Sequence, residues 1–250
     1  MNTLLSEARV KVSHRLAMHL HADSFRMRNA TPMVSFTFDD LPKSAATAGA
    51  DLLETHGARG TYYVSGGLVG AETPEWPTGD ADDVLSLHRR GHEIGCHTFS
   101  HRRVSDLDVA SLGNEILRNR EYFRALDASI ETRTFAYPYG YGSFGRKTQL
   151  KNQFQTCSSI VPGINSGETD LQFLCAVPLI DGQMDATGIE RLFDAAQTNN
   201  GWLIFYGHDV ADRPSPWGCS PVLLNDALAA AARRKIPTLT MAEALQCARA

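Results

Sequence analysis

The chain has 250 residues, with 24 Lys and Arg against 28 Asp and Glu, which gives a net charge of −4. This balance lacks the basic footprint of a nucleic-acid-binding protein, so no nucleic-acid partner is expected. Hydrophobic residues make up 43% of the chain, which suits one globular domain or a single barrel. We expect no membrane span, and the charged residues before residue 30 argue against a signal peptide. A cytoplasmic location is therefore expected, and the oligomeric state stays open.

Residues 1–30 are predicted to form a helical extension in front of a single domain that covers residues 31–250. Apolar residues in this extension recur at roughly helical spacing, which predicts a helix that covers one end of the core or contacts another subunit. No repeat and no low-complexity linker divides the rest of the chain. The apolar residues of the extension are Leu4, Leu5, Val10, Val12, Leu16, Met18 and Leu20.

From residue 33 onward, short apolar segments alternate with amphipathic segments. The predicted strands cover residues 33–40, 60–64, 93–96, 134–137, 154–160, 173–180, 202–206 and 237–240, and the predicted helices cover 44–56, 82–90, 106–126, 187–197, 223–234 and 242–248. Seven or eight β/α units predict an α/β fold, a distorted (β/α)7-8 barrel related to the TIM barrel. In such barrels, reactive groups gather at the carboxyl ends of the strands, where Asp39, His97, Tyr139 and His208 are expected.

His97 and His101 are four residues apart. On a helical turn, this spacing places both imidazoles on one face, close enough to share a cation. A carboxylate from another strand would complete the ligand set and leave positions open for water and substrate. His88 and His92 have the same spacing, but we interpret them as solvated or hydrogen-bonded within the core.

Asp39 and Asp40 end an apolar strand that Leu41 and Pro42 stop. Two adjacent carboxylates repel each other, and their burial is costly without a cation or hydrogen-bond donors. Once the strand has ended, both can face one site, where one can bind a metal and the other can activate water. The alternative is an Asp pair that caps the next helix.

Four ordered segments resemble the signature blocks of the polysaccharide deacetylases, the NodB-homology family or carbohydrate esterase family 4. They are residues 37–40 (TFDD), 91–101 (GHEIGCHTFSH), 135–140 (FAYPYG) and 205–208 (FYGH). The resemblance extends from about Met33 to Leu245. It implies a NodB-like barrel and an enzyme that removes the N-acetyl group from an N-acylated amino sugar or a polysaccharide precursor.

The resemblance also implies a role for each site residue. Asp40, His97 and His101 would bind a divalent metal, most often Zn²⁺, with Co²⁺, Ni²⁺ or Fe²⁺ as alternatives. Asp39 would be the base that activates the attacking water, His208 the general acid, and the Tyr139 N–H a donor to the oxyanion. This chemistry is consistent with metal-assisted hydrolysis, in which a cation activates water and polarises the amide carbonyl.

The chain departs from the family pattern at three places. Ala136 stands where an arginine usually orients the base, and Arg133 and Arg213 are candidates to replace that arginine. Leu41 stands where a glycine often follows the aspartate pair. The fourth block, with a carboxylate partner for the acid histidine and a tryptophan wall, is not evident. The candidates for it are Asp181 and Trp217.

These departures leave two other hypotheses open. One is a hydrolase of the same fold that cleaves a formamide or a cyclic amide, because the altered segments shape the substrate pocket. The other is a metal-retaining carbohydrate-binding protein without turnover, which Ala136 favours and the intact Asp39 and His208 oppose.

Overall fold

The computed structural model describes residues 2–250, with side chains from residue 8 onward except residue 9. Leu4 and Leu5 of the predicted apolar stripe therefore lie outside the described side chains. The strands are β1 (Ser24–Arg26), β2 (Met33–Asp39), β3 (Thr61–Val64), β4 (Glu93–Cys96), β5 (Thr134–Ala136), β6 (Thr156–Ser158), β7 (Glu168–Asp170), β8 (Val177–Pro178) and β9 (Trp202–Gly207). The helices are α1 (Asn2–His19), α2 (Ala50–Thr55), α3 (Ala81–Arg89), α4 (Val109–Leu126), α5 (Phe144–Lys151), α6 (Ala186–Thr198), α7 (Pro221–Arg233) and α8 (Met241–Arg249).

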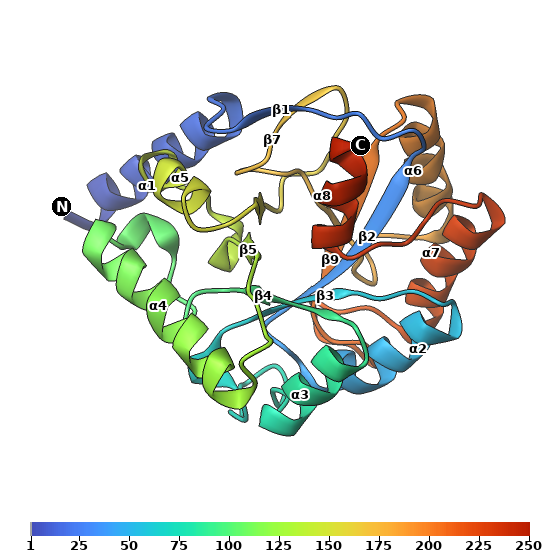
Figure 1. Cartoon of the computed structure of the whole chain (residues 1–250), viewed down its shortest axis with the longest axis horizontal. Helices are drawn as coiled ribbons and strands as arrows, with labels where there is room; N and C mark the ends of the chain where they lie inside the picture. The colour runs from blue at the N-terminus through green and yellow to red at the C-terminus, as the bar shows by residue number, and fades with distance from the viewer. Residues whose placement is uncertain (1) are drawn as a thin grey trace.

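Seven parallel strands form one curled sheet in the order β6-β5-β4-β3-β2-β9-β8, and helices surround it (Figure 1). Every residue of β2, which lies between β3 and β9 in the sheet, is buried. Helices pack on one face of this strand and the barrel interior lies on the other, so its apolar residues and the hydrogen-bonded Ser35 and Thr37 are buried alike. The predicted barrel of the NodB type is confirmed, in the form of an incompletely closed sheet.

The chain between β7 and β8 bridges the two edges of this sheet. The Leu171 carbonyl accepts a hydrogen bond from the Cys157 N–H at 2.8 Å. The Leu174 N–H donates to the Cys157 carbonyl, and the Leu174 carbonyl accepts the Ser159 N–H, both at 2.9 Å. A few residues later, Val177 pairs with Phe205 of β9. The predicted strand 173–180 is therefore shorter than expected, because most of its residues cross from one edge of the barrel to the other.

Two other predictions need correction. The predicted strand 237–240 is a single bridge between Thr238 and Val34, because β3 pairs only with the end of β2 and leaves room beside its start. The predicted helix 44–56 begins with a π-helical turn, Ala45–Gly49, before α2. A small antiparallel sheet of β1 and β7 was not predicted.

Side-chain caps fix where several helices begin. Asp80 accepts hydrogen bonds from the N–H groups of Asp82 and Asp83 and completes a capping box at the start of α3. Thr240 and Glu243 form the same arrangement at the start of α8. Such caps satisfy N–H groups that have no partner within the helix, which is why these helices start within a few residues of the predicted positions.

The amino-terminal helix α1 packs beside α5 (Figure 1). Its buried contact is Ala17, whereas Val12 and Leu20 of the predicted apolar stripe are 57% and 44% exposed. The prediction that this stripe covers the core is therefore wrong for these residues. The domain boundary near residue 30 stays a prediction. Among the described residues, no helix is both long and apolar enough to span a bilayer.

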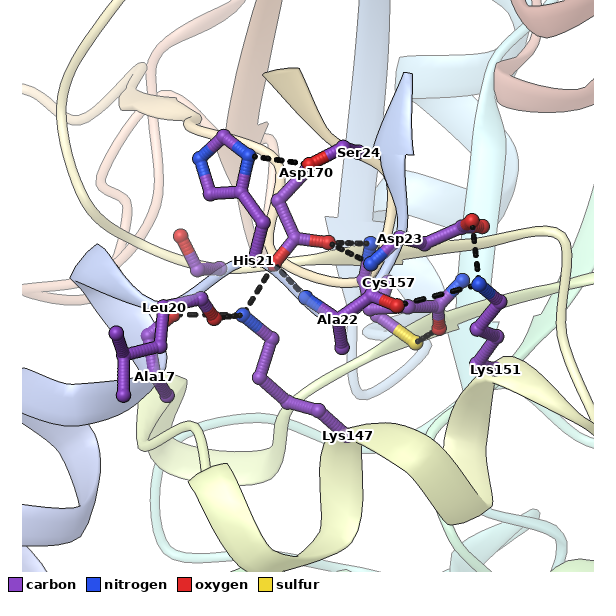
Figure 2. Close-up of polar contacts among 12 residues, drawn as sticks. Ala17, Leu20, His21, Ala22, Asp23, Ser24, Lys147, Lys151, Cys157 and Asp170 are labelled. Carbon is purple, nitrogen blue, oxygen red and sulfur yellow. Dashed lines mark hydrogen bonds and ion pairs between the residues drawn. The ribbon is translucent and has the colours of Figure 1, made fainter.

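A fully buried lysine, Lys147 of α5, fastens the end of α1 to the barrel (Figure 2). Its ammonium group donates to the carbonyls of Ala17 and Leu20 at 2.7 and 2.8 Å and forms an ion pair with Asp170. The Asp170 carboxylate also accepts three backbone N–H groups, from residues 22, 23 and 172. The ammonium therefore satisfies carbonyls at the end of α1 that the helix leaves without partners.

A glycine inside the barrel makes room for a tyrosine. A Cβ added to Gly95 of β4 would lie 2.5 Å from Cδ1 of Tyr63, which is fully buried on β3. Below it, Glu93 accepts hydrogen bonds from the hydroxyls of Thr61 and Thr134 at 3.0 and 2.6 Å. These contacts fill the barrel beneath the strand ends. The five cysteines are free, and Cys247 alone among them is exposed.

Candidate active site

The carboxyl ends of strands β5, β4, β2 and β9, at one edge of the sheet, bring the predicted site residues together. Asp39 ends β2, His97 follows β4, and His208 follows β9. Tyr139 lies in a short turn after β5. With Asp40 and His101, all six predicted site residues line one cleft of about 540 Å³.

Left-handed backbone conformations concentrate around this cleft. Residues 2–250 include seven non-glycine residues with positive φ, and five of these lie in the segments after β2, β4 and β5. They are Asp40, Leu41, Thr98, His101 and Tyr139. Each such residue costs about 1–2 kcal/mol relative to a right-handed conformation. The surrounding structure holds this strain where the functional side chains must turn inward.

His97 and His101 are brought together by an irregular loop. The prediction of a helical turn is wrong, because Thr98 and His101 have φ of 60° and 49°. The buried Glu115 of α4 holds the loop between them by accepting the N–H groups of Phe99 and Ser100 at 3.0 and 2.8 Å. The two imidazole centroids are 4.8 Å apart. The Glu115 carboxylate, and not a helical turn, thus holds the two imidazoles at this separation.

Asp40, His97 and His101 offer ligand atoms that lie within 4.8 Å of one another. Oδ1 of Asp40 is 3.2 Å from Nε2 of His101 and 3.6 Å from Nε2 of His97. Nδ1 of His97 is 2.9 Å from the Ala136 carbonyl, which can only accept, so Nδ1 carries the proton and Nε2 presents its lone pair. Oδ1 of Asp40 is buried without a hydrogen-bond donor. A divalent cation fits this ligand set of two imidazoles and one carboxylate, and it would satisfy the unpartnered carboxylate oxygen.

Burial disfavours charge on each of these groups. It raises the pKa of Asp40 and lowers the pKa of His97, and it lowers the pKa of His101 to about 4. The imidazoles are therefore neutral at neutral pH, the form in which they bind metals.

Asp39 lies beside this cluster and is 8% exposed. Burial, followed by the charge of Asp40, raises its pKa well above the usual range. Its Oδ1 has no hydrogen-bond partner among the described residues. The carboxylate is therefore poorly solvated, which favours its taking up a proton.

His208 faces the cluster from β9. Its Nδ1 is 3.2 Å from the Trp217 carbonyl, and its Nε2 is 3.8 Å from Oδ2 of Asp40. The carbonyl holds the proton at Nδ1, which leaves Nε2 directed at the site. Burial lowers the pKa of this imidazole, and the indole of Trp76 lies beside it with the ring centroids 5.3 Å apart.

The second histidine pair, His88 and His92, contacts other protein groups, as expected. His92 accepts the Gly60 N–H at Nδ1 and contacts Glu54 through Nε2, both at 3.0 Å. His88 contacts the Ser129 hydroxyl at the surface. Identical spacing therefore gives a ligand pair only after β4.

Comparison with known families identifies the chain. The model of the polysaccharide deacetylase family matches residues 26–154, just over half of the sequence. The chain belongs to this family. The matched region contains Asp39, Asp40, His97, His101 and Tyr139, but not His208.

A peptidoglycan-N-acetylglucosamine deacetylase of Bacillus cereus is 29% identical over 108 residues, which are 43% of this chain and 36% of that protein. The matches span between 16% and 48% of the lengths of the curated relatives. The structure of the chitin deacetylase from Colletotrichum lindemuthianum has a TM-score of 0.62 at 17% identity and covers 87% of this chain and 89% of its own. A family 4 acetyl xylan esterase from Clostridium thermocellum has a TM-score of 0.58 at 20% identity, with coverages of 86% and 90%. Both structures confirm the fold.

The departures from the family pattern have structural counterparts. Leu41 has a φ of 52°, a conformation that glycine adopts without strain, and its buried side chain packs against Gly79. Neither candidate replaces the arginine missing at Ala136. Arg133 forms an ion pair with Glu131 at the surface, and Arg213 is exposed with no contact to Asp39. The Asp39 carboxylate is therefore without an arginine partner among the described residues.

The candidates for the fourth block have different positions. Asp181 accepts the N–H and hydroxyl of Ser220 at the start of α7, so it is not the partner of His208. Trp217 lines the cleft and supplies the carbonyl that orients His208. A backbone carbonyl thus takes the place expected for a carboxylate. Trp202 lies in the core, where its indole N–H donates to the Ser35 hydroxyl.

Several residues of the cleft wall were not predicted from the sequence. Glu75 and Trp76 come from the long loop before α3, and Arg103 and Tyr141 from the segments after His101 and Tyr139. Aromatic residues in loops that follow strand ends are the signal that could have indicated them. Glu115 could have been noticed as a carboxylate on the buried face of α4.

Proposed function

We propose that the chain is a divalent-metal-dependent hydrolase that removes the N-acetyl or another N-acyl group from an acylated amino sugar. One observation carries the proposal. Asp40, His97 and His101 offer three ligand atoms within 4.8 Å of one another, next to the buried Asp39, whose Oδ1 has no hydrogen-bond partner among the described residues. Membership of the polysaccharide deacetylase family supports it, as do relatives that are named deacetylases of chitin and peptidoglycan.

The residues divide the proton transfers between them. Asp40, His97 and His101 would hold the cation, which supplies Lewis-acid activation of water and of the amide carbonyl when bound. Asp39 accepts the proton of the attacking water. His208, when charged, holds its second proton at Nε2 and donates it to the leaving nitrogen, because Nδ1 is bound to the Trp217 carbonyl. The Tyr139 N–H is proposed to donate to the oxyanion.

Zinc is the proposed native metal, because a site of two imidazoles and one carboxylate with open positions suits it. Cobalt, nickel and ferrous iron bind imidazole as well and remain alternatives. The acetyl xylan esterase of Clostridium thermocellum is described in complex with a cobalt ion. Metal content of the purified chain, measured by mass spectrometry, tests the choice.

The test of the proposed function is acetate release from N-acetylated mono- and oligosaccharides. We expect activity that a chelator abolishes and zinc restores. Asp39→Asn should abolish turnover and leave the metal bound, whereas His97→Ala should lose both. His88→Ala is the control, because His88 belongs to the pair that contacts only protein groups. Full activity of Asp39→Asn would show that the base is wrongly assigned.

The two alternatives predict different results. An enzyme for formamides or cyclic amides, which Ala136 favours through the altered surroundings of Asp39, would turn over those substrates and leave N-acetyl sugars intact. A carbohydrate-binding protein would bind sugars with metal present and release no acid from any of them.

A further inference from the structure

Arg103 brings a positive charge to the wall of the active-site cleft, two residues after His101. Its guanidinium carbon lies 5.5 Å from the ring centroid of Tyr139 and 4.9 Å from that of Tyr141. Such cation–π contacts hold the planar group in place. The guanidinium is therefore positioned before a ligand arrives.

The hydrogen-bond donors of this guanidinium are unused. Among the described residues, no carboxylate forms an ion pair with Arg103, although Asp39, Asp40 and Glu75 line the same cleft. Nε is enclosed and has no acceptor, whereas the two terminal amino groups are not enclosed and donate to no group among the described residues either. A partly buried cation without acceptors costs free energy that a bound anion recovers.

One aromatic ring links Arg103 to the candidate metal ligands. The ring centroid of Tyr139 lies 4.5 Å from that of the His101 imidazole and 5.5 Å from the guanidinium carbon of Arg103, and Arg103 itself forms no ion pair with Asp40 among the described residues. An anion at Arg103 would therefore lie beside the reacting amide and not at it. It would belong to another substituent of the sugar or to the neighbouring unit.

We propose that Arg103 is a substrate-binding residue and that the deacetylase prefers acylated sugars that carry a carboxylate or a phosphate near the N-acyl group. The forked guanidinium matches the planar geometry of both anions. This inference rests on the proposed function and narrows its substrate class.

The experiment compares three sugars on the metal-loaded full chain. N-acetylglucosamine is neutral, N-acetylglucosamine 6-phosphate carries a phosphate, and N-acetylmuramic acid carries a carboxylate. We expect kcat/KM to be roughly tenfold to a hundredfold higher for at least one of the anionic sugars, which also identifies the anion. Arg103→Gln should remove this preference mainly through KM, and Arg103→Lys should keep part of it. Arg102→Gln is the control, because Arg102 is exposed and does not line the cleft.

Equal kcat/KM for the three sugars in the unmodified chain would overturn the proposal. So would an equal loss for all three in Arg103→Gln, because that result indicates a structural role of the cation–π contacts. If no sugar is deacylated, the proposed function fails, and calorimetric binding of the two anionic sugars decides the matter for Arg103. Binding that Arg103→Gln weakens supports the anion site, and binding that the substitution leaves unchanged rejects it.

Discussion

Removal of the Lys147 ammonium should destabilise the whole chain. All three donors of this fully buried group are used, by Asp170 and by the carbonyls of Ala17 and Leu20. Lys147→Met would leave Asp170 as an uncompensated buried charge. Breaking a buried pair in this way costs about 3–5 kcal/mol, a large part of the roughly 5–15 kcal/mol that typically separates folded from unfolded domains.

Urea unfolding of the full chain, followed by tryptophan fluorescence, measures this loss. The matched control is Lys151→Met, one helical turn later, because Lys151 pairs with Asp23 at 2.9 Å while 43% exposed. An exposed pair contributes about 0–1 kcal/mol. The double variant Lys147→Met/Asp170→Asn buries no charge and should be less destabilised than the sum of its single variants.

The destabilisation caused by Lys147→Met should depend on pH. Burial raises the pKa of Asp170, but the hydrogen bond from Lys147 and those from backbone N–H groups outweigh it, so the net pKa is lowered. The stabilisation is therefore fully present above about pH 4, the usual value for an unfolded aspartate, and is lost as the pH falls through the lowered pKa. The difference between the unmodified chain and Lys147→Met should shrink below about pH 4. A loss no larger than that of Lys151→Met, or one independent of pH, would refute this reasoning.

Three further predictions concern the site and its supports. Glu115→Gln should weaken zinc binding roughly tenfold or more, measured by competition with a chelating dye, because the charged acceptor for the loop between the two ligand histidines is lost. His14→Ala should speed amide hydrogen exchange in the segment after β5, since an N–H of that segment bonds to its Nδ1, while the exposed His21→Ala should not. Gly95→Ala should destabilise the chain by about 1–3 kcal/mol in urea unfolding, because its Cβ would collide with Tyr63; a neutral result would contradict the described packing.

The strand ends were the most predictable part of the site. Apolar runs that stop at polar residues indicate where parallel strands end, and parallel strands end at the same edge of a sheet. This is why Asp39, His97 and His208 could be expected to meet before any coordinates were known. The strand before His97 was predicted with the bounds that the structure gives it.

The backbone between the strand ends was less predictable. Threonine and histidine seldom adopt positive φ, so no local pattern indicates that Thr98 and His101 do. The conformation depends on Glu115, which contacts the loop from a helix that starts later in the chain. Lys147 is a similar case, because its partners come from the carboxyl end of α1 and from β7. Contacts between such distant segments leave no periodic pattern in the sequence.

The place of β2 in the sheet has a consequence for how the chain folds. Met33 pairs with Trp202, so one of the two neighbours of β2, the strand β9, is not synthesised until most of the chain has been made. Until then, a strand that is buried along its whole length leaves one edge of backbone N–H and C=O groups unpaired, the kind of edge that aggregates. Charged side chains cannot protect it, because both faces become core. The pairing of β2 with β9 is therefore the step at which dilution, low temperature or a chaperone should most improve the yield of folded protein.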